Sequence, residues 1–262
     1  MPPLPLPPLA PADTIAGLAK GLAVLESFDT ERQRLNATMA AQRAGITRAA
    51  ARRHLLTLAH LGYLESDGGY FWLAPKVLRF SGAYMASARL PRVVQPELHR
   101  LAALTGLSFS CAVREGDYVV IIARSAVRDS TERLRAHGVH LGSRLPIHAT
   151  STGRVLLAAL PEAVCADWLA HTDMQRLTAH TTHDATQLGA LLEAVRQQDY
   201  CVAIEEHELG VQALAVPLRD MHGHVLAALN VVTATHRLSA RDLQQELLPL
   251  LQEAARLLRP LM

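Results

Sequence analysis

The stretch Ala41–Leu61 places the strongest constraint on how this 262-residue chain can fold, because its spacing is that of two short helices joined by a tight turn. Gly45 follows the small Ala41 by four positions and comes just before the apolar Ile46. Glycine readily adopts the left-handed conformation that such a turn requires. The sequence therefore predicts a helix-turn-helix whose second helix begins after Thr47, its expected N-cap.

The second helix of this pair separates apolar side chains from basic ones. Its apolar residues recur every three or four positions, which predicts a single buried stripe made of Ala51, Leu55, Leu58 and Leu61. The N-terminal part of the opposite face carries Thr47, Arg48, Ala49, Arg52 and Arg53. A recognition helix meets base edges and phosphates with this part of its surface. Judged on this helix alone, an ordinary amphipathic helix with a solvated basic face is an equal alternative.

The segments on both sides of the pair favour a DNA-binding fold. Thr14–Phe28 predicts a first helix that packs against the pair, with its apolar face formed by Ile15, Leu18, Leu22, Leu25 and Phe28. Asn36 is the expected cap of a short helix over 37–44. After Gly62, two extended runs flank Asp67-Gly68-Gly69, which is the signal of a β-hairpin. Helices followed by a hairpin make a winged helix, so DNA binding is favoured over the solvated-face alternative.

A connecting helix and a mixed body follow the hairpin. Pro75 opens the connecting segment, and the pattern changes after Pro91. Expected strands cover 107–114, 118–123, 201–204, 213–218 and 225–232, and expected helices cover 93–104, 152–160, 162–170, 185–198 and 239–258. Short turns between strands, with helices at the edges, predict an α+β domain around an antiparallel sheet. The expected organisation is a proline-rich tail (1–13), a winged helix-turn-helix domain (14–75), a linker helix (76–90) and a second domain (91–262).

Charge and composition agree with a small DNA reader attached to a larger body. Residues 1–90 hold 10 Lys or Arg against 6 Asp or Glu, whereas the remaining residues hold 16 against 18, so the basic excess lies with the predicted reader. No apolar run reaches membrane-spanning length, and the proline-rich start does not form a signal peptide, so a soluble cytoplasmic protein is expected. The wide spacing of Cys111, Cys165 and Cys201 favours reduced core residues.

Three motifs, in order along the chain, resemble the IclR family of bacterial transcriptional regulators. They are GITRAAARRHLLTLAHLGYL, LPIHATSTGRVLLAAL and EEHELGVQALAVPLRDMHGHVLAALNVV, the last followed by a long terminal helix. The arginine-rich helix is most similar to the subgroup that controls protocatechuate and 4-hydroxybenzoate catabolism. The resemblance implies a winged helix that binds double-stranded operator DNA as a homodimer, often assembled to a tetramer, and a GAF-like domain that binds a small organic acid. RNA polymerase is a further candidate partner, and no cofactor is expected.

The segment around Thr150 has features that suit the carboxylate of such an acid. An extended stretch runs into Thr150, Ser151 and Thr152 at a helix start, where free backbone N–H groups attract anions. Arg144 and His148 can add charge-assisted hydrogen bonds. A hydroxyl at this place can also simply cap the helix, and the two roles are compatible.

The family resemblance implies further residues of the effector pocket, namely Leu145, Ile147, Gly153, Ala203, Ala213, Asn230 and Val232. Ala203, Ala213 and Val232 are apolar where relatives that respond to very polar acids place polar groups. An apolar pocket favours an aromatic or longer-chain acid, with Asn230 left to hydrogen-bond a hydroxyl or a carboxylate. The expected effector belongs to the 4-hydroxybenzoate, protocatechuate or β-ketoadipate class.

Other kinds of chemistry have weaker support in the sequence. The histidine pairs have no cysteine nearby to complete a tetrahedral site, so no metal is expected at His137 and His140, His180 and His183, or His222 and His224. The acidic residues Glu205, Glu206 and Glu208 predict a solvated turn rather than a catalytic acid and base. The chain has no GxSxG, P-loop or GxGxxG. A regulator is therefore expected, and the alternative is a small-molecule-processing enzyme with an appended DNA-binding module.

Overall fold

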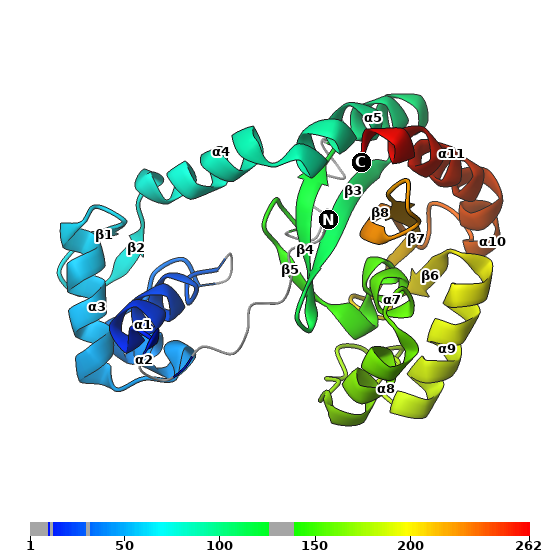
Figure 1. The fold of residues 1–262 in the computed structure, drawn as a ribbon. Helices are drawn as coiled ribbons and strands as arrows, with labels where there is room; N and C mark the ends of the chain where they lie inside the picture. The colour runs from blue at the N-terminus through cyan, green and yellow to red at the C-terminus, as the bar shows by residue number, and fades with distance from the viewer. Residues whose placement is uncertain (1–9, 11–12, 30–31, 126–138) are drawn as a thin grey trace. The chain divides into compact units, whose positions relative to one another are not determined.

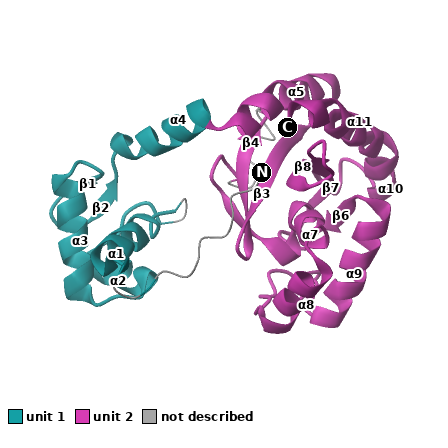
Figure 2. Ribbon diagram, in the orientation of Figure 1, with its two compact units in different colours: residues 1–87 teal, residues 88–262 magenta. Residues whose placement is uncertain are grey.

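The chain folds into two compact units, as the computed structural model shows (Figures 1 and 2). The structure describes residues 10, 13–29, 32–125 and 139–262. Unit 1 covers residues 1–87 and unit 2 covers residues 88–262. Within these described ranges, no helix is long and apolar enough to cross a membrane.

Unit 1 contains the predicted helix-turn-helix and hairpin. Its elements are α1 (Ala16–Leu25), α2 (Ala37–Ala44), α3 (Arg48–His60), β1 (Leu64–Ser66), β2 (Phe71–Leu73), a 3-10 turn (Pro75–Val77) and α4 (Leu78–Ser87). Asn36 caps α2 by accepting hydrogen bonds from the N–H groups of Thr38 and Met39, each at 3.0 Å. Gly45 ends α2 with a φ of 63°, so the glycine provides the left-handed turn that the sequence predicted.

The apolar face predicted for α1 is wrong in its first part and confirmed at its end. Ile15, Leu18 and Leu22 are 72%, 60% and 49% exposed. Phe28 is buried and Leu25 packs against the core, together with Val24, which was not predicted. α1 packs against α2 and α3 through the side that carries Val24. Because successive helical residues are about 100° apart, Leu22 and Ile15 point roughly opposite to Val24. The helix therefore leaves an apolar stripe uncovered within unit 1.

The buried stripe predicted for α3 is confirmed at its start and wrong at its end. Ala51 and Leu55 are fully buried, but Leu61 is 49% exposed. The helix ends at His60, and Gly62, with a φ of 77°, turns the chain directly after Leu61. Leu61 therefore lies outside the helical stripe and does not reach the core. Burial resumes in β1, where Leu64 is only 2% exposed. β1 and β2 then pair antiparallel, which confirms the hairpin.

Unit 2 is built on a six-stranded sheet in the described residues, with the order β5-β4-β3-β8-β7-β6. Every pair of neighbours is antiparallel, which confirms the predicted α+β architecture. The strands are β3 (Ser108–Glu115), β4 (Tyr118–Arg124), β5 (Arg144–Pro146), β6 (Cys201–Ile204), β7 (Val211–Arg219) and β8 (Val225–Ala234). The helices are α5 (Arg89–Thr105), α7 (Ser151–Ala158), α8 (Glu162–His171), α9 (Ala185–Gln198), α10 (Ala240–Asp242) and α11 (Leu248–Leu258).

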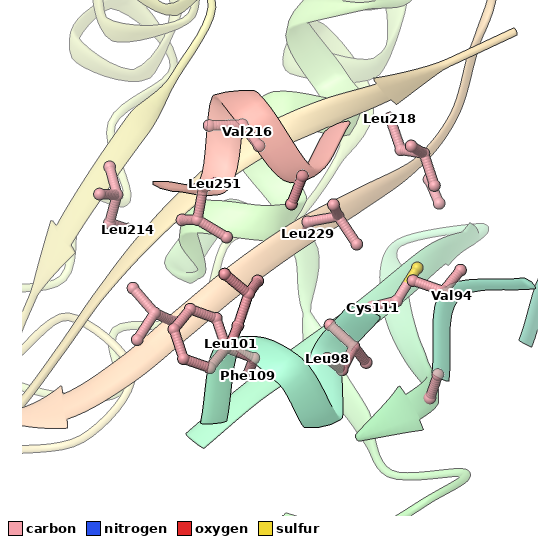
Figure 3. Packing of buried hydrophobic residues seen from close by; sticks show 14 of the residues in the cluster. Val94, Leu98, Leu101, Phe109, Cys111, Leu214, Val216, Leu218, Leu229 and Leu251 are labelled. Atoms are coloured by element: carbon pink, nitrogen blue, oxygen red, sulfur yellow. The ribbon is translucent and has the colours of Figure 1, made fainter. Parts of the chain in front are cut away.

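One face of this sheet is covered by α5 and α11. Leu98 and Leu101 of α5 and Leu251 of α11 pack against Phe109 of β3 and Leu229 of β8 (Figure 3). All five side chains are fully buried. Side chains on a strand alternate between the two faces, so the residues next to Phe109 and Leu229 point to the other side of the sheet.

The opposite face is covered in part by α7, while α9 packs against α7 and α8 packs against α9. Leu157 of α7, Trp168 of α8 and Leu192 of α9 belong to one buried cluster with strand residues such as Ala112 and Ala228. The strand side chains here are small, which lets α7 approach the sheet closely. Beside the start of α7, other small strand residues, Ser110, Ala203 and Ala213, line a cavity.

The C-terminal helix predicted over 239–258 is confirmed, but it is not a regular α-helix throughout. A π-helical segment, Leu243–Leu247, separates α10 from α11. Pro249 lies in the first turn of α11 and has no N–H to donate to the preceding turn. The wider turn before the proline accommodates this missing hydrogen bond.

Candidate functional site

The exposed surface of α3 carries the residues predicted to read DNA. Thr47 caps the helix, because its Oγ1 accepts a hydrogen bond from the N–H of Ala50 at 3.3 Å. The predicted contact residues Thr47, Arg48, Ala49, Arg52 and Arg53 are all exposed. Arg43 of α2 is held in an ion pair by Asp29, whereas the three α3 arginines form no such pair with any described residue. Their guanidinium groups are available for phosphates or bases.

The tip of the β1–β2 hairpin is fixed by Asp67. Its carboxylate accepts hydrogen bonds from the N–H groups of Tyr70 at 2.8 Å and Gly69 at 3.1 Å. These bonds hold the pKa of Asp67 below its usual value. Arg34 pairs with the same carboxylate, and its guanidinium carbon lies 4.6 Å from the centre of the Trp72 ring. The carboxylate at the hairpin tip is thus held by backbone N–H groups and neutralised by Arg34, whereas the three arginines of α3 have no such partner among the described residues.

Unit 2 contains a cavity of about 650 Å³. Small-molecule sites in proteins commonly enclose roughly 300–1,000 Å³. The walls come from the sheet face that also carries α7, from the N-terminus of α7, from the loop after β6 and from the segment after β8. Both apolar and polar side chains line the cavity.

The cavity brings together several residues predicted to contact an effector, namely Leu145, Thr150, Ser151, Thr152, Ala203, Ala213, Asn230 and Val232. Three of them are direct neighbours across strands, since Ala203 pairs with Ala213 and Ala213 pairs with Val232. Cross-strand neighbours point to the same face. Together these three side chains form a flat apolar row that suits the face of an aromatic ring.

Arg144 and Ile147 lie outside the cavity wall. Arg144 is on the edge strand β5, where its Nε is 2.7 Å from Glu115 Oε2 and its guanidinium stacks on Tyr118. Its side chain is 53% exposed, because alternation turns it away from the cavity that Leu145 faces. Ile147 is fully buried, since the 3-10 turn after β5 directs it into the core under α7.

His148 and Gly153, also predicted to contact the effector, have structural positions instead. His148 is buried, with its Nε2 3.0 Å from the carbonyl oxygen of Gln175. Burial lowers the pKa of His148, so at pH 7 the ring is neutral and adds no positive charge. Gly153 passes so close to the preceding turn that a Cβ would lie 1.9 Å from the carbonyl oxygen of Ile147. Glycine is therefore needed here for packing.

A buried ion pair borders the cavity and was not predicted. Arg154 of α7 is 2% exposed and donates two hydrogen bonds to the Glu206 carboxylate, one of them at 2.5 Å. Its Nε donates to the carbonyl oxygen of His148 at 2.9 Å, and Glu206 also accepts from the N–H of Thr182 at 2.9 Å. The solvated turn predicted over 205–208 is wrong for Glu206, because its side chain is buried. The positive charge of Arg154 on α7 offsets the cost of burying this carboxylate. The pair fixes the loop after β6 to α7.

Two hydroxyl groups at the cavity have unused hydrogen-bonding capacity. Ser151 Oγ and Thr233 Oγ1 are buried and have no hydrogen-bond partner in the part of the chain that is described. Thr150 Oγ1 accepts from the N–H of Gly153 at 3.1 Å, so Thr150 is the cap of α7. A buried polar group left unsatisfied costs about 1–3 kcal/mol. A polar ligand that reaches Ser151 would recover this free energy.

Sequence reasoning missed several polar residues of the cavity wall, including Ser110, Arg124, Glu206, His236 and Arg237. Ser110 donates its hydroxyl hydrogen to Asn230 Oδ1. Arg124 lies at the end of β4, and a strict alternation along the strand gave no sign that it faces the cavity. Arg237 and His236 follow β8 in a turn, where periodicity carries no signal.

The cysteines and histidines form no further site in the described residues. Cys111, Cys165 and Cys201 are buried and unpaired by disulfides. Burial raises the pKa of Cys111 to about 12 and that of Cys201 to about 11, so both thiols stay protonated. Among the described positions, no group of three His, Cys, Asp or Glu residues is placed to hold a metal ion. His137 lies outside the described residues, so its pairing with His140 is not described.

Two family models match the chain, one for each unit. The model described as the bacterial transcriptional regulator IclR C-terminal matches residues 82–259. The model described as the IclR helix-turn-helix domain matches residues 17–68. Together they include the reader helix α3 and the whole cavity wall.

Two known regulatory proteins and one solved structure are also similar to this chain. The Pca operon regulatory protein of Acinetobacter baylyi is 51% identical over 94% of this chain and 89% of its own length. The p-hydroxybenzoate hydroxylase transcriptional activator of the same organism is 50% identical over 95% of this chain and 92% of its own length. A double mutant of the PobR inducer-binding domain from Acinetobacter, solved with 3-hydroxybenzoic acid, matches with a TM-score of 0.63 and 44% identity over 66% of this chain and 98% of that one.

Proposed function

Because the chain belongs to the IclR family of bacterial transcriptional regulators, we propose that it reads operator DNA with α3 and senses a small aromatic acid in the cavity of unit 2. Membership in this family makes it a DNA-binding regulator rather than an enzyme. The genes that it controls are those of aromatic-acid catabolism, and it acts in the cytoplasm where operator DNA is accessible. The observation that carries the proposal is the cavity, because it combines an apolar row with unsatisfied polar groups.

The chemistry of the cavity supports an aromatic acid over a very polar one. The row of Ala203, Ala213 and Val232 offers a flat apolar surface to a ring. Ser151 offers a hydroxyl to a polar substituent at the start of α7. The names of two relatives refer to p-hydroxybenzoate hydroxylase and to the Pca operon, which supports a ligand of the 4-hydroxybenzoate, protocatechuate or β-ketoadipate class. A ligand that binds one conformation of unit 2 more tightly shifts the population that binds DNA.

Titration of the full-length chain with candidate acids tests the effector proposal. We expect at least one of 4-hydroxybenzoate, protocatechuate and β-ketoadipate to give saturable binding by isothermal titration calorimetry. Glyoxylate should bind more weakly than the acid of this set that binds. At a ligand concentration of 100 times Kd, binding should stabilise the folded chain by about 2.7 kcal/mol. A sensor should leave the ligand chemically unaltered after incubation, and the ligand should change the affinity of the protein for operator DNA. Binding of glyoxylate alone would contradict the proposal.

Substitutions on α3 test the DNA-binding surface. Arg48→Ala and Arg52→Ala are expected to reduce discrimination between operator and scrambled DNA by about 1–3 kcal/mol, the range for a bidentate base contact. Arg53→Ala is expected to weaken binding to both DNAs alike, because a phosphate contact carries no sequence information. Gel-shift titrations at one salt concentration measure both effects. Arg256→Ala in unit 2 is the control, since Arg256 pairs with Glu253, and unchanged DNA binding in all three α3 variants would refute the assignment.

A homodimer is part of the proposal. Ile15, Leu18 and Leu22 form an exposed apolar stripe on α1, and such a stripe is typical of a surface that another chain covers. Two copies of α3 in a dimer would read two half-sites of one operator. A pair of dimers would make a tetramer, and RNA polymerase is the partner through which a bound regulator would act. Sedimentation equilibrium of the full chain measures the assembly, and a monomer at micromolar concentration would refute this part.

A further inference from the structure

A β-bulge in β4 decides which way Arg124 points. The register between β3 and β4 shifts between Cys111 and Ala112, and the shift leaves Ile122 without a partner on β3. An extra residue of this kind reverses the alternation of side chains beyond it. Ile121 lines the cavity, and Arg124, three residues later, lines it too. Without the bulge, an odd separation would send Arg124 to the opposite face, against the core that α5 covers.

The guanidinium group of Arg124 is half-buried at the cavity and lacks a counter-ion among the described residues. Burial lowers its pKa, and no acidic side chain in the described part of the chain offsets the effect. Other charged residues described in the cavity wall are already engaged, since Glu206 is neutralised by Arg154, and Arg237 and Glu208 have interactions of their own. A cation that is partly removed from water and not compensated favours an anionic ligand.

Arg124 stands in one cross-strand row with Ser110 and Asn230. Arg124 is directly opposite Ser110 on β3, and Ser110 is directly opposite Asn230 on β8. Side chains related in this way have Cβ atoms about 4.5–5.5 Å apart, within reach of one small ligand. The next row on the same face contains Val232 and Ala213. A planar acid with its carboxylate at Arg124 therefore has its ring beside an apolar surface.

We propose that Arg124 is the carboxylate anchor of the cavity and that it sets the preference for an acid over its neutral analogue, an inference that rests on the proposed function. The start of α7 is the competing place for the carboxylate. A helix N-terminus carries about half a unit of positive charge, and Thr150 already occupies one of its N–H groups. Arg124 carries a full charge and can bind a carboxylate with two parallel hydrogen bonds. The carboxylate goes to Arg124, which leaves the Ser151 hydroxyl for a ring hydroxyl.

A comparison of 4-hydroxybenzoate with 4-hydroxybenzamide tests the anchor, because the two compounds differ in charge and little in shape. Calorimetric titration of the full-length wild type is expected to show tighter binding of the acid. Arg124→Gln is expected to weaken acid binding by about 10- to 100-fold, the range for a lost charge-assisted hydrogen bond, and to change amide binding by less than about threefold. Arg144→Gln is the matched control and should leave both affinities unchanged, because Arg144 lies outside the cavity.

A second measurement separates an anchor from a residue that merely supports the fold. Arg124→Met removes an uncompensated cation, so the thermal midpoint of the ligand-free chain should rise by roughly 2–4 °C while acid binding falls. A structural role would lower the midpoint. Retention of the acid preference by Arg124→Gln, or a lowered midpoint in Arg124→Met, would overturn the anchor and leave the effector proposal intact. If the wild type binds neither 4-hydroxybenzoate nor 4-hydroxybenzamide, both the Arg124 anchor and the proposal of a hydroxybenzoate-sized aromatic effector would be overturned.

Discussion

Replacing Glu206 with glutamine is expected to lower the free energy of unfolding of unit 2 by about 3–5 kcal/mol, the usual cost of removing one partner from a buried ion pair. The substitution leaves the guanidinium of Arg154, only 2% exposed, without its carboxylate. The carbonyl oxygen of His148 still accepts a hydrogen bond from Arg154 Nε. This carbonyl oxygen is neutral, so it does not replace the negative charge of Glu206. Urea-induced unfolding of the full-length chain measures the change.

Two further variants show whether burial of the charge causes this loss. Glu253→Gln removes the partner of Arg256 in a pair whose side chains are 47% and 71% exposed, so it should lower the free energy of unfolding far less than Glu206→Gln does. The double variant with Arg154→Met and Glu206→Leu removes both charges, so it should be more stable than Glu206→Gln alone. Equal, small losses in Glu206→Gln and Glu253→Gln would show that the buried pair has no special role in stability.

Gly153→Ala is expected to destabilise unit 2 by about 3 kcal/mol or more, at the upper end of the cost of overpacking. An added Cβ would lie 1.9 Å from the carbonyl oxygen, 2.6 Å from the carbonyl carbon and 2.7 Å from the Cα of Ile147. These are backbone atoms, so the turn Ile147–Ala149 has to move. Ala149 lines the cavity, and effector affinity should therefore fall together with stability. Thermal unfolding and calorimetric titration of one preparation measure both.

Gly189→Ala is the matched control for Gly153, because both glycines lie within helices. The nearest atom to a Cβ at Gly189 is Leu169 Cδ1 at 3.5 Å, an ordinary contact with a flexible side chain. Alanine at this position should therefore stabilise α9 by about 0.5–1 kcal/mol through its better helix propensity. A Gly153→Ala variant as stable as the wild type would mean that α7 does not pass the turn as closely as this structure has it.

Local signals in the sequence located the helix-turn-helix, because each signal acts within a few residues. Asn36 caps α2 through its own side chain, and Gly45 alone supplies the left-handed turn before α3. The hairpin around Asp67 is equally local, since its carboxylate bonds the next N–H groups along the chain. The family resemblance added the effector domain, and the matches of both family models agree with it.

Helix faces were harder to predict from the sequence, because an apolar stripe does not say which partner covers it. The stripe of Ile15, Leu18 and Leu22 on α1 is regular, yet α2 and α3 pack against the side of Val24. Leu61 continued the spacing of α3, but the helix ends at His60 and Gly62 turns the chain directly after Leu61. Periodicity is a property of one element, whereas burial depends on the elements around it.

The sequence by itself determined the order of helices and strands, the reader helix and the segment that opens α7, since these depend on short-range periodicity, caps and turns. Only the tertiary structure decided which charged side chains line the cavity. Glu206 is buried because Arg154, 52 residues earlier, reaches it from another element. Arg124 faces the cavity because one unpaired residue in β4 reverses the alternation of its strand. Pairing between distant segments sets both outcomes, and neither residue carries that information in its own neighbourhood.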